Sequence, residues 1–155
     1  PGFIDTHSHA DSSLFELPDA LPATSQGITT AIVGQDGGSE WPLSEFFQRL
    51  EREPVALNVA SYSGHNTLRD RIMGKDFRRH ANDGEVEAMA SLLDQDMAAG
   101  ALGLSTGMEY DPGIYSDPAE VLMLARVAAA LEGAPAGEQI TASWLQELGR
   151  EAASG

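Results

Sequence analysis

The sequence contains no cysteine and a single lysine, and positive charge is scarce: Lys and Arg together number 9 against 24 Asp and Glu. Without cysteine the chain has neither a disulfide framework nor a thiolate metal ligand. The formal net charge of −15 at pH 7 would repel nucleic-acid phosphates and anionic lipid surfaces, so we expect neither as a partner.

The sequence also lacks long apolar runs. No stretch approaches the roughly 18 consecutive apolar residues that indicate a membrane-spanning helix, and the first residues do not have the pattern of a signal peptide. We therefore expect no membrane partner and a cytoplasmic location.

Short apolar segments alternate with amphipathic ones along most of the chain. The segments with the apolar or β-branched composition of buried strands lie at residues 3–4, 28–33, 55–60 and 101–106. Helical patterns lie between and after them, at residues 20–26, 42–53, 83–99 and 117–131. In the last of these helices Asp117, Pro118 and Glu120 stand where an N-cap, a first-turn proline and a capping-box acid are expected. Strands alternating with helices predict a parallel α/β fold.

Two histidines follow the first strand segment, in the run Asp5-Thr-His7-Ser-His9. Residues two apart in a strand share a face, so His7 and His9 are expected to point into one cavity. Neutral imidazole is the commonest protein ligand for zinc and similar metals, which favours a metal site here. A His-x-His tripeptide also occurs by chance, and Asp5 fits either a partner of a histidine or a packing residue.

Other polar side chains follow the later strand segments, where parallel α/β proteins build their sites. Asp36 lies in Gly34-Gln-Asp-Gly37, directly after the second strand segment, and Asp-Gly is a common turn pair. His65, Arg69, Glu109 and Tyr110 also follow strand segments, and each fits a structural partner or loop packing as well as a residue of a site. Ser105 has no Ser-His-Asp frame around it, so a serine hydrolase is not expected.

Four segments resemble, in order, the N-acyl-D-amino-acid deacylase (D-aminoacylase) family of the amidohydrolase superfamily. These segments are Pro1-Gly-Phe-Ile-Asp-Thr-His-Ser-His9, Ser25-Gln-Gly-Ile-Thr-Thr30, Gly64-His-Asn-Thr-Leu-Arg69 and Gly100-Ala-Leu-Gly-Leu-Ser-Thr-Gly107. The resemblance implies a metal-bearing (β/α)8 TIM barrel, of which residues 1–131 would form about the first four βα units. Residues 132–155, expected to be a linker and a helix at about 140–153, are of uncertain origin. A complete barrel needs at least about 200 residues, so we expect these 155 residues to be part of a longer protein.

The same resemblance implies zinc-dependent hydrolysis of N-acyl-D-amino acids, small molecules that yield a carboxylate and a free D-amino acid. One or two zinc ions, or another divalent metal, would be held by His7, His9 and Asp36, with Asp36 standing where the family often has a cysteine. His65, Arg69, Glu109 and Tyr110 would contact substrate.

The family takes its general base and further metal histidines from later barrel strands, so we expect this chain alone to be inactive. An open half-barrel also predicts self-association through unpaired strand edges.

Two alternatives remain from the sequence. The first is a non-catalytic metal-binding or interaction domain derived from such a barrel. The second is another cyclic-amide hydrolase, related to dihydroorotases or hydantoinases, which use a carboxylated lysine on a middle strand. The single lysine, Lys75, falls in a predicted loop and does not favour the second alternative.

Overall fold

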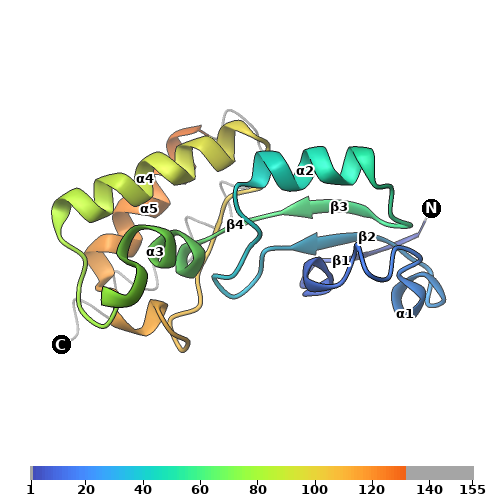
Figure 1. The fold of residues 1–155 in the computed structure, drawn as a ribbon, viewed down its shortest axis with the longest axis horizontal. Helices are drawn as coiled ribbons and strands as arrows, with labels where there is room; N and C mark the ends of the chain where they lie inside the picture. Colours follow the sequence, from blue (N-terminus) through green and yellow to red (C-terminus); the bar gives the residue numbers. More distant parts are fainter. Residues whose placement is uncertain (1, 132–155) are drawn as a thin grey trace.

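A parallel sheet forms the first half of the molecule in the computed structural model, which describes residues 2–131. Strands β1 (Phe3–Asp5), β2 (Ile28–Val33) and β3 (Asn58–Ser61) lie side by side in sequence order, and each neighbouring pair is parallel (Figure 1). All the carboxyl ends therefore lie at one edge of the sheet, which confirms the parallel α/β arrangement.

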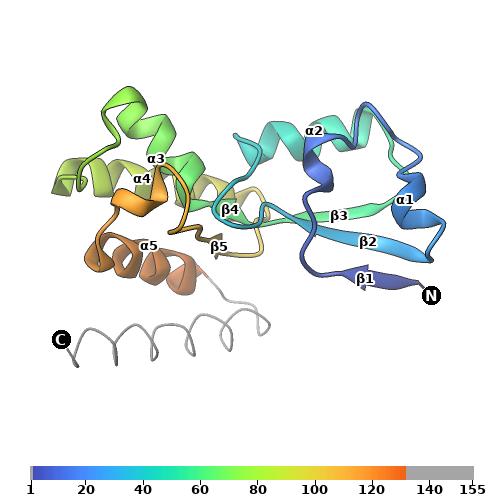
Figure 2. The ribbon, with the colours of Figure 1, turned by 90° about the horizontal axis from the view of Figure 1, so that it is seen from below.

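The third strand continues past a one-residue interruption and changes partners. Tyr62 N still donates to Val33 O at 3.0 Å, and Ser63 N then donates to Gly103 O at 2.9 Å. Strand β4 (Ser63–Gly64) pairs in parallel with β5 (Leu104–Ser105). The backbone thus passes from a sheet with β2 to a two-stranded sheet with β5 (Figure 2), and in both sheets the parallel partners follow sequence order.

The helices cover this sheet and extend the molecule beyond its carboxyl edge. Helix α2 (Leu43–Arg52) runs along β2 and β3, whereas α3 (His65–Met73), α4 (Asp83–Ala98) and α5 (Pro118–Leu131) form a group at the other end (Figure 1). Short helical segments complete the connections: η1 (Ala10–Ser12), α1 (Leu21–Thr24), η2 (Gly74–Asp76) and η3 (Gly113–Tyr115).

Each of the two parts of the molecule, the sheet with α2 and the group of α3, α4 and α5, has its own hydrophobic cluster. The first joins the sheet to α2 through Leu14, Ala31, Val33, Leu43 and Phe46, all of them buried. The second joins α3, α4 and α5 through Leu68, Met89, Leu93, Leu124 and Ala128. Helices α2 and α4 therefore bury the apolar faces that their sequence periodicity indicated.

The expectation that the first strand is buried is wrong. Phe3 and Ile4 are 72% and 61% exposed, because among residues 2–131 β1 has a neighbour, β2, on one side only. The apolar composition of this segment indicated a buried strand, but a strand is buried only where neighbouring segments cover it on each side.

Segment 61–69, for which the sequence indicated no helix, is also different in the structure. Its second half begins α3, a helix that runs from His65 to Met73. No glycine or proline interrupts those residues, and Leu68 and Met73 supply a buried face. Strands β3 and β5 are shorter than the ranges predicted for them, which were 55–60 and 101–106.

No helix among residues 2–131 is both long enough and apolar enough to cross a bilayer. The linker and helix predicted for residues 132–155 lie outside the described residues, so the proposed domain boundary near residue 131 stays a prediction.

Candidate metal centre

The two histidines that follow β1 converge, as the sequence predicted, but they lie in irregular backbone and not in a strand. Strand β1 ends at Asp5, so His7 and His9 lie in irregular chain beyond it. Ser8 N donates to Ile32 O at 3.0 Å, and Asp5 Oδ1 accepts a hydrogen bond from His7 N at 3.3 Å. These bonds keep the segment against β2, and the two imidazole rings lie with their centroids 5.4 Å apart.

Asp36 comes from the turn that follows β2. Gly38 N donates to Gln35 O at 2.9 Å, and the two central residues, Asp36 and Gly37, have positive φ angles of 53° and 78°. A turn with two positive φ angles favours the Asp-Gly pair, because both residues tolerate the left-handed region. The sequence left open whether Asp36 is a turn residue or a ligand, and its position is compatible with both roles at once.

One carboxylate oxygen of Asp36 faces both imidazoles. Asp36 Oδ2 lies 3.3 Å from His7 Nε2 and 3.2 Å from His9 Nε2, and one ligand atom from each residue lies within 4.8 Å of the other two. The side chains of His7, His9 and Asp36 are 58%, 62% and 43% exposed. The cluster is therefore open to solvent at the carboxyl edge of the sheet.

The residues of this cluster fit a divalent metal. Imidazole nitrogen and carboxylate oxygen bind Zn²⁺ at about 2.0–2.2 Å, and tetrahedral geometry then separates two ligand atoms by about 3.3–3.5 Å. The separations of 3.3 and 3.2 Å are close to that value. Two nitrogens and one oxygen also leave room for further ligands, as in catalytic zinc sites.

His65 and Arg69 lie elsewhere, in a closed cluster with Glu120 of α5. Both are fully buried, and Glu120 is 3% exposed. His65 Nε2 lies 2.7 Å from Glu120 Oε1, and Arg69 Nη1 donates to both carboxylate oxygens. Arg69 Nη2 donates to Phe77 O and Arg79 O at 3.1 and 2.9 Å.

The charge state of Glu120 follows from these partners. Burial by itself raises the pKa of Glu120, but hydrogen bonds from His65 and Arg69, and the charges of both, outweigh it and hold the pKa below its usual value. This geometry favours the structural alternative for His65 and Arg69, and their contact with substrate stays a prediction.

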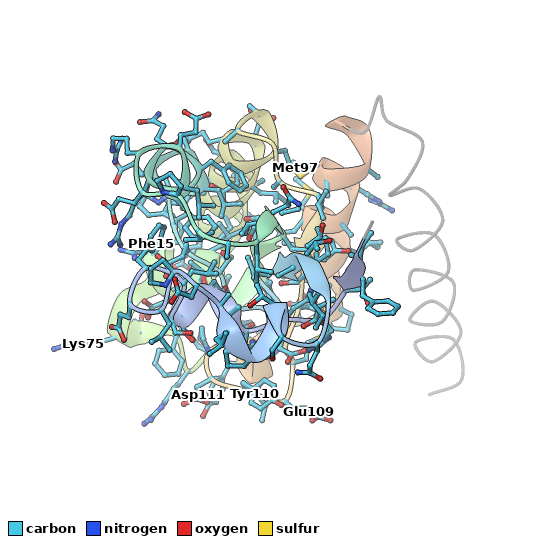
Figure 3. The ribbon with its side chains drawn as sticks, turned by 90° about the vertical axis from the view of Figure 1, so that its right-hand side faces the viewer. Phe15, Lys75, Met97, Glu109, Tyr110 and Asp111 are labelled. Carbon is cyan, nitrogen blue, oxygen red and sulfur yellow. The ribbon has the colours of Figure 1, made fainter. Side chains whose placement is uncertain are left out.

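Glu109 and Tyr110 lie on the exposed loop that follows β5. Figure 3 shows both, with Asp111, at the edge of the molecule, and both are exposed. Asn66 Nδ2 donates to Gly107 O at 3.0 Å, and a Cβ atom on Gly107 would collide with the carbonyl of Asp36. The loop therefore starts directly against the metal-site turn, and the substrate role of Glu109 and Tyr110 stays a prediction.

Three residues around the Asp36 turn were missed at the sequence level. Asp11 Oδ2 accepts a hydrogen bond from Gly34 N, Gln35 Nε2 donates to Thr6 O, and Ser105 Oγ bonds to the turn from β5. Gln35 follows β2 closely and Ser105 ends β5, a position that could have indicated both residues, whereas Asp11 lies in η1 and has no such signal. Ser105 was weighed only as a nucleophile, and its hydroxyl is committed instead to Gly34 O at 2.6 Å.

Parallel strands in sequence order, with two histidines and a carboxylate at their carboxyl edge, define an α/β protein of the (β/α)8-barrel type with a candidate metal centre. Comparison with known proteins agrees. The model of the amidohydrolase family matches residues 1–153. The chain belongs to the amidohydrolase family.

Its relatives confirm the resemblance to N-acyl-D-amino-acid deacylases. D-aminoacylase of Alcaligenes xylosoxydans xylosoxydans is 35% identical, over 97% of this chain and 37% of its own length. N-acyl-D-aspartate deacylase of the same organism is 38% identical, over 79% of this chain and 29% of its own length. The chain thus spans about a third of the length of these relatives.

Solved structures confirm the fold class. A crystal structure of D-aminoacylase aligns with a TM-score of 0.78 at 34% identity, covering 86% of this chain and 33% of that one. N-acyl-D-glutamate deacylase from Bordetella bronchiseptica aligns with a TM-score of 0.81 at 37% identity, covering 84% and 32%. That structure contains zinc and a phosphonate mimic of the tetrahedral intermediate, and D-aminoacylase has a binuclear metal centre.

Proposed function

We propose that this chain carries part of the metal site of an amidohydrolase that cleaves the amide bond of N-acyl-D-amino acids. The observation that supports this most directly is the convergence of His7, His9 and Asp36 on one point, with Asp36 Oδ2 at 3.3 and 3.2 Å from the two imidazole nitrogens. The relatives named D-aminoacylase and N-acyl-D-aspartate deacylase supply the substrate class.

His7, His9 and Asp36 would hold one divalent metal, with Zn²⁺ as the ion that suits two imidazoles and a carboxylate. When bound, such a metal polarises the scissile carbonyl and lowers the pKa of a bound water. The chain's own residues provide the ligands, and the Asp-Gly turn orients the carboxylate toward both imidazoles. Glu109 and Tyr110, on the loop that begins against this turn, are the residues we expect to meet substrate.

The described residues do not include a second cluster of this kind. Among residues 2–131, His7, His9 and Asp36 form the one group of three or more His, Asp or Glu side chains with ligand-forming geometry. Of the remaining histidines, His65 pairs with Glu120 and His80 Nδ1 lies 3.5 Å from Asp117 Oδ2. We therefore expect the 155-residue chain to bind metal without turnover of an N-acetyl-D-amino acid.

Lys75 gives no support to a hydrolase that depends on a carboxylated lysine. It lies in η2 (Gly74–Asp76) and is exposed, and Figure 3 shows it projecting outward at the edge of the molecule.

Titration of the chain with Zn²⁺ by calorimetry tests the metal site. We expect saturable binding that weakens at least tenfold in His7→Ala and in His9→Ala, because each variant removes one ligand. His80→Ala is the matched control, an exposed histidine outside the cluster, and should bind zinc like the original chain. Equal affinity in His7→Ala and His80→Ala would exclude this site.

A chimera tests the reaction. This chain replaces the matching third of D-aminoacylase, and the folded, zinc-loaded chimera should hydrolyse N-acetyl-D-amino acids in preference to the L enantiomers. His7→Ala in the chimera should lower kcat/KM at least a hundredfold. A folded chimera that binds zinc and has no deacylase activity would refute the proposed reaction while leaving the metal site intact.

A further inference from the structure

The position of Asp36 depends on a short, glycine-rich turn. Asp36 stands between Gly34 and Gly37, and its own φ of 53° and the values of 73° and 78° at the two glycines lie in the left-handed region. Glycine leaves the backbone with many alternative conformations, and the left-handed region is less favourable than the right-handed one for a residue with a side chain, such as Asp36. A carboxylate on such a turn faces a fixed point only if other parts of the protein hold the turn.

Ser105 holds this turn on both sides of Asp36. Its hydroxyl donates to Gly34 O at 2.6 Å and accepts a hydrogen bond from Gly37 N at 3.2 Å. The two bonds use the single donor hydrogen of the hydroxyl and one of its two acceptor lone pairs. Because they join the backbone two residues before Asp36 to the backbone one residue after it, they close the segment that carries the ligand.

Ser105 is itself fixed by the sheet. It lies in β5, and its register partner is Gly64 in β4. The next residue, His65, begins α3, in which Thr67 N donates to Gly37 O at 3.1 Å. The hydroxyl therefore belongs to the rigid part of the fold, and the turn is fastened to it.

We propose that Ser105 is a positioning residue for the metal centre, whose hydroxyl clamps residues 34–37 so that the Asp36 carboxylate points at His7 and His9. This inference rests on the proposed metal site, and it assigns Ser105 no contact with metal or substrate. Loss of the hydroxyl leaves all three ligands in the chain and frees the turn that carries one of them.

Zinc and cobalt titrations of the 155-residue chain test this role. Ser105→Ala should weaken binding of both ions at least tenfold and change the visible absorption of bound Co²⁺, which reports ligand geometry. Ser63→Ala is the matched control: Ser63 is a buried serine in the partner strand β4, and its hydroxyl donates to Asp96 Oδ2 at 2.7 Å rather than to the turn. That variant should lose stability while its metal affinity stays within twofold.

An isosteric pair separates the hydroxyl from side-chain volume. Ser105→Thr keeps a hydroxyl and Ser105→Val replaces it with a methyl group, and both β-branched side chains suit a strand. We expect the Thr variant to bind zinc within about threefold of the original chain and the Val variant to bind like Ser105→Ala. Equal affinities for Thr and Val variants would overturn the inference.

The hydrogen-exchange rate of the Gly37 amide reports on its hydrogen bond to the Ser105 hydroxyl in the absence of metal. Exchange should be at least tenfold faster in Ser105→Ala and Ser105→Val than in Ser105→Thr. If neither the original chain nor any variant binds metal, the proposed metal site is refuted. If the Gly37 amide exchanges at the same rate in Ser105→Ala as in the original chain, the Ser105 hydroxyl does not hold the turn. If the original chain binds zinc and Ser105→Ala binds it equally well, only the positioning role is refuted.

Discussion

Arg69 of α3 donates hydrogen bonds from one guanidinium nitrogen to both carboxylate oxygens of Glu120 of α5, and both residues are buried. Two residues 51 positions apart in the sequence thus join α3 to α5 through a buried ion pair. His65 lies on the same carboxylate at 2.7 Å. The cluster connects the start of α3, next to the metal-site turn, with the first turn of α5.

Removal of one partner from this ion pair should destabilise the fold strongly. Arg69→Met leaves the Glu120 carboxylate buried without its main cation, which typically costs about 3–5 kcal/mol. Urea unfolding followed by circular dichroism measures the loss. The control is Glu53→Gln, which breaks the exposed Arg49–Glu53 pair and should cost at most about 1 kcal/mol. Similar losses in both variants would contradict a buried, charge-dependent cluster.

The stability of the fold should fall in acid through Glu120. The pKa of folded Glu120 lies below the ordinary value of 4.5, so the unfolded chain takes up a proton first as the pH is lowered. Glu120 therefore contributes stability above pH 4.5 that is lost as the pH falls through the folded pKa. In Glu120→Gln, the free energy of unfolding should change less steeply with pH in that range.

Asp96 provides a control of opposite sign for the acid titration. Burial raises its pKa above the ordinary 3.8 and outweighs the hydrogen bonds from Ser63 and from Leu43 N. Its ionised form therefore destabilises the fold, increasingly so as pH rises from 3.8 through the folded pKa. Asp96→Asn should make the loss of stability in acid steeper, and a shallower slope would contradict this assignment.

The two roles of Asp36 can be separated by substitution. Asp36→Asn and Asp36→Gly both tolerate the positive φ of 53°, so the unfolding free energy should change by less than about 1 kcal/mol. Both lack a carboxylate, and zinc affinity should fall at least tenfold. Asp36→Val, with a β-branched side chain, should lose stability as well. Retained zinc binding in Asp36→Gly would exclude the carboxylate as a ligand.

The exposed side of β1 should promote self-association. Among the described residues it has no strand on its outer side, and Phe3 and Ile4 present their side chains to solvent. Sedimentation velocity should show association that grows with concentration and decreases in Phe3→Lys. Met123→Lys, at an exposed position on α5, adds the same charge elsewhere and should leave association unchanged.

Local patterns were sufficient for much of the fold. The β-branched run at 28–33 forms β2 with the same bounds, and the helix predicted at 83–99 agrees with α4 to within one residue. Local patterns also indicated His7 and His9 as ligands, and the resemblance to the deacylase family added Asp36; all three residues follow strands whose carboxyl ends meet. Parallel pairing makes that convergence a general consequence of the fold.

Glu120 shows where local patterns were insufficient. As expected, Asp117 accepts a hydrogen bond from Glu120 N at 2.9 Å and caps α5. The Glu120 side chain, however, turns away from the helix terminus to Arg69 and His65, since a buried cation attracts a carboxylate more strongly than a solvated backbone amide does. A contact 51 residues away in the chain leaves no periodic signal in the sequence.

The residue types and their spacing along the chain were enough to establish the alternation of strands and helices, the cluster of ligand candidates and the family. Other features arise only when segments distant in the sequence meet in the fold. These are the burial of His65 and Arg69, the exposure of β1, and the hydrogen bonds of Ser105 to the Asp36 turn. Hydrogen bonds and burial depend on distances in space, which the spacing of residues along a chain does not specify.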